Sequence, residues 1–165
     1  MNRVGMVAGS FDPITNGHEW LIRQALDICD KVFVIVGNNP AKKYMFDAET
    51  RVNMIHDVIG VDNYEWFVVD HLLNDLLINA ARDSGCNYLI RGIRSSADFE
   101  YEAQVQLINR KICPDIETLF LIPPRELTEV SSSTVKGLVG FNGWQDVVST
   151  YVHPTVLRRL ERRQS

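Results

Sequence analysis

Short runs of β-branched and apolar residues alternate with longer stretches of helical periodicity along the sequence. The runs at residues 4–8, 32–37, 64–69, 88–90 and 118–122 have the length and composition of strands. The second run is too uniformly apolar for a strand with one face in water, which indicates burial on both faces. A chain that alternates such strands with helices forms a parallel sheet covered on both faces. We therefore predict an α/β fold with a parallel sheet of about five strands.

The helices between these strands are predicted from the spacing of their apolar residues. They cover residues 17–29, a segment that starts near Asp47, residues 73–81 and residues 98–112. Asp47 is a good N-cap, because its carboxylate can accept from a free amide in the first helical turn. Two or three short helices follow the fifth strand, and Pro154 suits the first turn of one of them.

The size and charge of the chain limit the classes of function that it can have. The 165 residues, 45% of them apolar, can bury a core without disulfides or metal. We see no linker or repeat and expect a single domain over residues 1–165. The net charge of −4 disfavours a nucleic-acid partner. The basic run at residues 158–163 is either the solvated face of a terminal helix or a patch for nucleic acid or membrane.

Cysteine usage and hydropathy indicate the compartment. Cys29, Cys86 and Cys113 include no Cys-x-x-Cys pair and lie in or beside apolar segments. Free buried thiols in a reducing compartment fit this pattern better than disulfides or a zinc site. No apolar stretch approaches the ~18 residues of a membrane span, and the first residues do not resemble a signal peptide. We expect a cytoplasmic protein without a membrane partner.

Ligands of parallel α/β sheets bind at the carboxyl ends of the strands, so the residues after each strand carry the functional information. The first strand is followed by Ser10, by the turn signals Asp12-Pro13 and Asn16-Gly17, and by His18. His18 lies near the start of the next helix, where free amides and the helix dipole attract anions. This segment is either a phosphate cradle or a plain strand–turn–helix connection with a helix-capping histidine.

Three later loops carry cations or hydroxyls at the same end of the predicted sheet. Lys42 and Lys43 either meet a phosphate or form a solvated surface pair. Arg91 and Arg94 suit phosphate oxygens, or they form ion pairs with the acidic residues just downstream. Residues 131–134 are either an N-cap cluster or hydroxyls at a phosphate-binding helix start. Because four loops converge in this way, we predict an anion-binding site despite the negative net charge.

The same loops resemble a known family. Gly9-Ser10-Phe11-Asp12-Pro13 with Thr15-Asn16-Gly17-His18 resembles the signature of the nucleotidylyltransferase superfamily, with Thr15 where a histidine is usual. The variant is similar to that of the bacterial phosphopantetheine adenylyltransferases. Further similar segments follow in that family's order: Lys42-Lys43-Tyr44-Met45-Phe46, Arg91-Gly92-Ile93-Arg94 with residues 98–102, and Val130-Ser131-Ser132-Ser133. Tyr44 stands where the family's loop has proline, and Leu127 stands where an aromatic residue is common.

The resemblance implies a reaction and a set of partners. ATP and 4′-phosphopantetheine would give dephospho-coenzyme A and pyrophosphate, a step of coenzyme A synthesis. The family also implies a Rossmann-like fold, Mg²⁺ as cofactor, a homohexamer, and coenzyme A as a feedback inhibitor. The metal would be held by ATP phosphates and water, so no residue of the chain is predicted as a metal ligand.

The resemblance also implies residue roles. His18, Lys42 and Arg94 would be catalytic, with His18 stabilising the transition state and Lys42 bridging the acceptor phosphate and the α-phosphate. The implied ATP-binding residues are Ser10, Phe11, Gly17, His18, Gly92, Ile93, Arg94, Glu102, Val130, Ser131, Ser132 and Ser133. The implied phosphopantetheine-binding residues are Ser10, Lys42, Leu77, Arg91 and Asn109.

Three other interpretations are compatible with these residues. The same chemistry could act on another acceptor, such as nicotinamide mononucleotide, or could transfer a cytidylyl group. Lys42 and the block from Arg91 to Glu102 favour phosphopantetheine. A non-catalytic nucleotide sensor would not need His18, Lys42 and Arg94 together, and a nucleic-acid-binding protein is disfavoured by the acidic balance.

Overall fold

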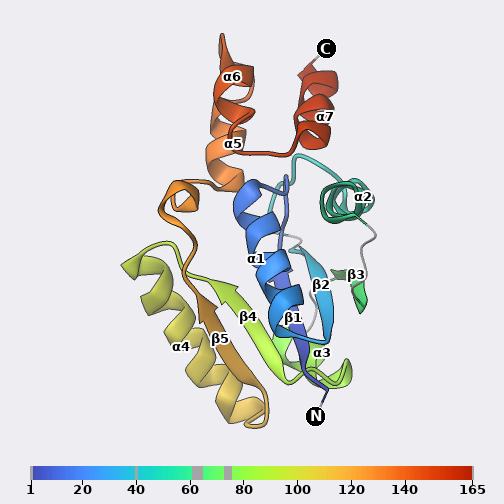
Figure 1. The fold of residues 1–165 in the computed structure, drawn as a ribbon, viewed down its shortest axis with the longest axis vertical. Coiled ribbons are helices and arrows are strands. Elements are labelled where there is room, and N and C mark those ends of the chain that lie inside the picture. The colour runs from blue at the N-terminus through green and yellow to red at the C-terminus, as the bar shows by residue number, and fades with distance from the viewer. Residues whose placement is uncertain (1, 40, 61–64, 73–75, 165) are drawn as a thin grey trace.

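Five parallel strands form the centre of the computed structural model, which describes residues 2–39, 41–60, 65–72 and 76–164. The strands lie in the order β3-β2-β1-β4-β5, and every neighbouring pair is parallel. This confirms the predicted sheet and its strand number (Figure 1). The strands are β1 (Val4–Gly9), β2 (Lys31–Asn38), β3 (Glu65–Leu72), β4 (Tyr88–Gly92) and β5 (Glu117–Leu121).

Helices alternate with the strands as predicted, and the chain ends in a group of short helices (Figure 1). Between the strands lie α1 (Asn16–Ile28), α2 (Ala48–Ile59), α3 (Leu77–Asp83) and α4 (Ser96–Ile112). After β5 come the 3-10 turn η1 (Arg125–Leu127), α5 (Ser132–Leu138), α6 (Trp144–Val148) and α7 (Pro154–Gln164). Within the described ranges, no helix is long and apolar enough to cross a bilayer.

The sheet buries apolar side chains on both faces. Because successive strand residues point to opposite sides, Val7 of β1 joins one core while its neighbour Met6 joins the other. The larger core packs the sheet against α1, α2 and the C-terminal helices, and the smaller core packs it against α3. Both faces of β1 are therefore dry, which is what its uninterrupted apolar sequence requires.

The observed helix boundaries agree with some of the boundaries predicted from local sequence signals and differ from others. Asp47 caps α2 as predicted, since its Oδ1 accepts from the Thr50 amide at 2.7 Å. The turn predicted at Asn16-Gly17 is wrong, because both residues lie in the first turn of α1 behind the N-cap Thr15. In the helix predicted over 73–81, Leu73 lies outside the described residues and Leu76 is the N-cap of α3.

The C-terminal basic run lies on a helix that packs against the larger core. Val156 and Leu160 of α7 are fully buried, and Arg159 pairs with Asp57 of α2 at 2.7 Å. The guanidinium of Arg163 lies 5.7 Å from the ring centroid of Phe46. These contacts favour the interpretation of residues 158–163 as the outer face of a terminal helix.

Substitution of Gly5 tests how closely β1 packs against its neighbours. A Cβ atom at Gly5 would lie 2.7 Å from Cys29 Sγ and 3.0 Å from Ile90 Cδ1. We expect Gly5→Ala to lower the free energy of unfolding by about 1–3 kcal/mol, measured by urea denaturation, because the core must shift to admit the methyl group. Gly137→Ala, which meets nothing within 4 Å on α5, is the control and should be neutral or slightly stabilising. Equal stabilities of the two variants would contradict this packing.

Candidate active site

A cavity of about 500 Å³ opens at the carboxyl ends of β1 and β4. The strand order reverses between these two strands, which is where open α/β sheets bind their ligands. Most residues that the sequence predicted as functional line this one cavity. They are Ser10, Phe11, Gly17, His18, Lys42, Arg91, Gly92, Arg94, Glu102, Val130, Ser131, Ser132 and Ser133.

Within the described part of the chain, the cavity lining does not include three of the predicted binding residues: Ile93, Leu77 and Asn109. The side chain of Ile93 is buried, and its amide donates to the Leu121 carbonyl. Leu77 packs against the smaller core under α3. Asn109 lies two helical turns beyond Glu102 on α4, roughly 10 Å further along the helix axis.

His18 both caps α1 and faces the cavity. The Thr15 amide donates to His18 Nδ1 at 3.1 Å, and the Thr15 hydroxyl lies 2.8 Å from the same nitrogen. Since Nδ1 accepts from the amide, the proton of the neutral ring is on Nε2. The predicted alternatives of a helix cap and a ligand-facing group are therefore both satisfied, because the two ring nitrogens take different roles.

Burial keeps the His18 ring neutral at physiological pH. Desolvation, which is the larger cause, and the nearby positive charge of Arg94 together lower the pKa of His18 to about 4. The His18 ring also packs edge-to-face with the Phe11 ring, with ring centroids 5.1 Å apart. A neutral imidazole fixed in this way can donate a hydrogen bond from Nε2 to an anion, but it is a poor general base.

Two arginines are held at the cavity wall by carboxylates from α4. Arg91 forms a two-pronged ion pair with Glu102, with its Nε 2.9 Å from Oε2, and it also donates to the Ala8 carbonyl. Arg94 pairs more loosely with Asp98 at 3.2 Å. The ion pairs predicted as an alternative to phosphate binding therefore exist, and they orient both guanidinium groups at the cavity.

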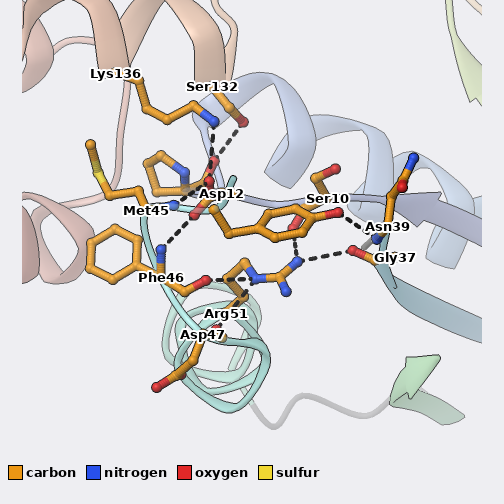
Figure 2. Close-up of polar contacts among 12 residues, drawn as sticks. Ser10, Asp12, Gly37, Asn39, Met45, Phe46, Asp47, Arg51, Ser132 and Lys136 are labelled. Atoms are coloured by element: carbon orange, nitrogen blue, oxygen red, sulfur yellow. Dashed lines mark hydrogen bonds and ion pairs between the residues drawn. The ribbon is translucent and has the colours of Figure 1, made fainter. Parts of the chain in front are cut away.

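The buried carboxylate of Asp12 was missed as a site residue. It accepts from the Met45 amide and the Phe46 amide, both at 2.8 Å, and from Lys136 Nζ at 3.1 Å (Figure 2). In the sequence, Asp12-Pro13 was interpreted as a turn signal and as part of the family signature, and Asp12 was given no role in the site. Lys136 lies four residues after Ser132 and therefore on the same face of α5, which was the one available signal for its place in the site.

The lining has an excess of positive charge. Its five cations, Lys42, Lys43, Arg91, Arg94 and Lys136, outnumber its three carboxylates, Asp12, Asp98 and Glu102. In contrast, the whole chain has a net charge of −4. The predicted local focus of positive charge is therefore present, and the cavity suits a ligand that carries several negative charges.

Comparison with known proteins defines the class. Residues 6–138 match the family described as cytidylyltransferase-like. The fold is similar to that of a Plasmodium falciparum nicotinic acid mononucleotide adenylyltransferase, with a TM-score of 0.73 over 98% of this chain and 96% of that one. The identity of 16% limits this likeness to the fold. The family match over residues 6–138 places the chain among the cytidylyltransferase-like nucleotidyltransferases.

Relatives of higher identity narrow the family. The phosphopantetheine adenylyltransferase of Chromobacterium violaceum is 46% identical over 93% of this chain and 92% of its own length. The phosphopantetheine adenylyltransferase of Alkaliphilus metalliredigens is 42% identical over 98% of this chain and 99% of its own. The chain belongs to the phosphopantetheine adenylyltransferase family, as its motifs predicted, and it is an adenylyltransferase.

The environment of His18 predicts its titration. Because its pKa is about 4 in the folded protein and about 6.5 when unfolded, the unfolded chain binds more protons between these pH values. Protonation of His18 therefore opposes folding as the pH falls through this window. We expect the His18 ring signals in an NMR titration to move near pH 4, and Arg94→Ala to shift that midpoint upward. A midpoint near 6.5 in the wild type would contradict the buried neutral ring.

Proposed function

We propose that this cavity transfers AMP from ATP to 4′-phosphopantetheine, giving dephospho-coenzyme A and pyrophosphate. The observation that supports this function best is the set of cations around a neutral, donor-oriented His18 at the strand-order reversal. Both substrates bear phosphate, so binding them together requires the local positive charge that the lining provides. Membership in the family supports phosphopantetheine as the acceptor.

The reaction requires that the substrates be positioned and that developing negative charge be stabilised, more than it requires a general base. The attacking group is a phosphate oxygen of the acceptor, which is already ionised near pH 7. The barrier comes from bringing two anions together and from charge that grows on the α-phosphate and on the leaving pyrophosphate. In the proposal, His18 Nε2 donates to the α-phosphate, Lys42 joins that phosphate to the acceptor, and Arg94 stabilises the leaving group.

The remaining lining residues divide between the two substrates in this proposal. The β1–α1 loop with Ser10, Phe11 and Gly17, the segment from Gly92 to Glu102, and Val130 to Ser133 would hold ATP. Arg91, Ser10 and Lys42 would hold phosphopantetheine. Ile93, Leu77 and Asn109 keep their implied roles as proposals, although the cavity does not include them.

Magnesium is part of the proposal as a companion of ATP. No cluster of three or more potential metal-ligating side chains occurs within the described part of the chain. The cavity carboxylates Asp12, Asp98 and Glu102 are each engaged by a cation of the chain. Because these carboxylates are paired with cations of the chain, the lining is compatible with a Mg²⁺ ion that binds together with ATP. That ion would neutralise charge on the triphosphate, and ATP oxygens and water would supply its ligands.

We further propose a cytoplasmic homohexamer with one domain over residues 1–165 and coenzyme A as a feedback inhibitor. The α4 helix supports association, because none of its side chains is fully buried. Large apolar side chains are exposed on and beside this helix: Phe99, Tyr101, Leu107, Ile108, Ile112 and Ile122. Of these, Tyr101, Ile108 and Ile112 share one face of α4, and exposed apolar groups that gather on one face are typical of an association surface. Coenzyme A contains the product, so it would compete for the same cavity.

Removal of His18 or Lys42 tests the proposed roles. We expect His18→Ala and Lys42→Ala each to lower turnover about a hundredfold or more, because both groups act where charge develops. The dissociation constant for ATP should change far less. Pyrophosphate release and calorimetric ATP titration measure the two effects.

His56→Ala is the matched control, since His56 is exposed on α2 and away from the cavity lining. It should leave turnover unchanged. Loss of ATP affinity with turnover retained in either site variant would argue against the assigned roles. Wild-type turnover in both would remove His18 and Lys42 from the mechanism.

The oligomer has its own test. Light scattering should give a mass six times that of the 18.8 kDa chain. Ile108→Glu should reduce that mass, because it places a charge on the exposed apolar face of α4 that Ile108 shares with Tyr101 and Ile112. A wild-type monomer at all concentrations would rule out the hexamer without affecting the proposed chemistry.

A further inference from the structure

The segment that carries Lys42 has little regular structure of its own. We call residues 39–46 the lysine loop; the structure describes all of them except residue 40. The side chains of Lys42 and Lys43 are exposed, and the loop joins the end of β2 to the start of α2. Asp12 fixes the far end of the loop through two backbone amides. The beginning of the loop needs a separate anchor if Lys42 is to keep its place.

Tyr44 provides a contact across the loop. Its hydroxyl oxygen accepts from the Asn39 amide at 2.7 Å. Asn39 in turn accepts from two residues further along the loop: its carbonyl accepts from the Lys42 amide at 2.9 Å, and its side-chain Oδ1 accepts from the Ala41 amide at 2.9 Å. The Tyr44 hydroxyl therefore fixes Asn39, whose carbonyl accepts the hydrogen bond from the Lys42 backbone amide.

The ring of Tyr44 lies on a buried cation. The Arg51 guanidinium carbon is 4.2 Å from the centre of the ring, and the Arg51 side chain has no exposed surface. Desolvated cation–π contacts are stronger than those at the surface. A planar guanidinium can also stack on an aromatic ring, which a lysine ammonium cannot do.

Arg51 is itself fixed to the elements around the site. Its Nη1 donates to the Ser10 carbonyl at 2.8 Å and to the Gly37 carbonyl at 3.0 Å, while its Nε donates to the Phe46 carbonyl at 3.1 Å (Figure 2). Its Nη2 donates to Asn38 Oδ1 at 2.6 Å. Arg51 thus joins the ends of β1 and β2 to the end of the lysine loop, and it presents a rigid platform to Tyr44.

We propose that Tyr44 is a positioning residue that holds Lys42 at the cavity, by its hydroxyl on Asn39 and its ring on Arg51. This rests on the proposed role of Lys42. A proline, which the similar family carries here, restricts the loop through its own covalent ring. In this chain, side-chain contacts to Asn39 and Arg51 give the restriction instead. The role of Tyr44 can therefore be removed in two steps, first the hydroxyl and then the ring.

The test is a series of Tyr44 variants with two readouts. Hydrogen exchange of the lysine-loop amides should speed up about fivefold in Tyr44→Phe and about thirtyfold in Tyr44→Ala, as the loss of one and then two contacts implies. Exchange in β1 and β4 should stay unchanged. Turnover with phosphopantetheine should fall in the same order, while the dissociation constant for ATP stays constant. Tyr44→Pro should recover part of the turnover that Tyr44→Ala loses.

Tyr151→Phe is the matched control, because its hydroxyl bonds to Glu129 outside the cavity lining. It should change neither readout. Unchanged loop exchange in both Tyr44→Phe and Tyr44→Ala would overturn the proposal, as would faster exchange spread evenly over the core strands. Faster loop exchange with full turnover would also overturn it if Lys42→Ala is inactive. If Lys42→Ala is active as well, the fault lies in the proposed role of Lys42, on which this inference rests.

Discussion

The arrangement of the site depends on the hydrogen bonds and the ion pair that the buried Asp12 carboxylate accepts. Asp12 is 1% exposed and gathers two amides of the lysine loop and the ammonium group of Lys136 on one side chain. Removing it would leave the Met45 and Phe46 amides without their acceptor, which is costly where they are shielded from water, and would leave Lys136, whose side chain is 34% exposed, without its ion-pair partner. The β1–α1 loop, the lysine loop and α5 meet at this point, so the walls of the cavity are fixed relative to one another.

The sheet order explains why one acidic chain can bind two anionic substrates. With β1 and β4 adjacent, His18 at the start of α1, Arg91 near the end of β4 and Arg94 just after β4 all line one cavity at the reversal point. Carboxylates from α4 orient the two arginines without cancelling the positive charge of the whole lining. The net charge of the chain thus says little about its site, because the relevant charges are concentrated at one end of the sheet.

Local signals predicted most of the fold and much of the site. The strands were visible as apolar runs. His18, Lys42 and Arg94 follow strands, and Arg91 lies in the last two residues of β4, at the edge of the sheet that parallel pairing sets. The Asp12–Lys136 pair spans 124 positions, so no local pattern could predict it. Arg51 lies on the face of α2 that also holds Met54, Ile55 and Val58, and this spacing was a usable sign of its burial. Leu77 and Asn109 came from resemblance alone, and the cavity does not include them.

The central claim is the identity of the acceptor, and a product assay tests it most directly. Purified protein with ATP and Mg²⁺ is given 4′-phosphopantetheine or, in parallel, nicotinamide mononucleotide. The account predicts pyrophosphate release with phosphopantetheine alone, together with a product of the mass of dephospho-coenzyme A. Release only with the mononucleotide would contradict the assignment of phosphopantetheine as the acceptor. No release with either acceptor, despite measurable ATP binding, would contradict the assignment of the protein as an adenylyltransferase.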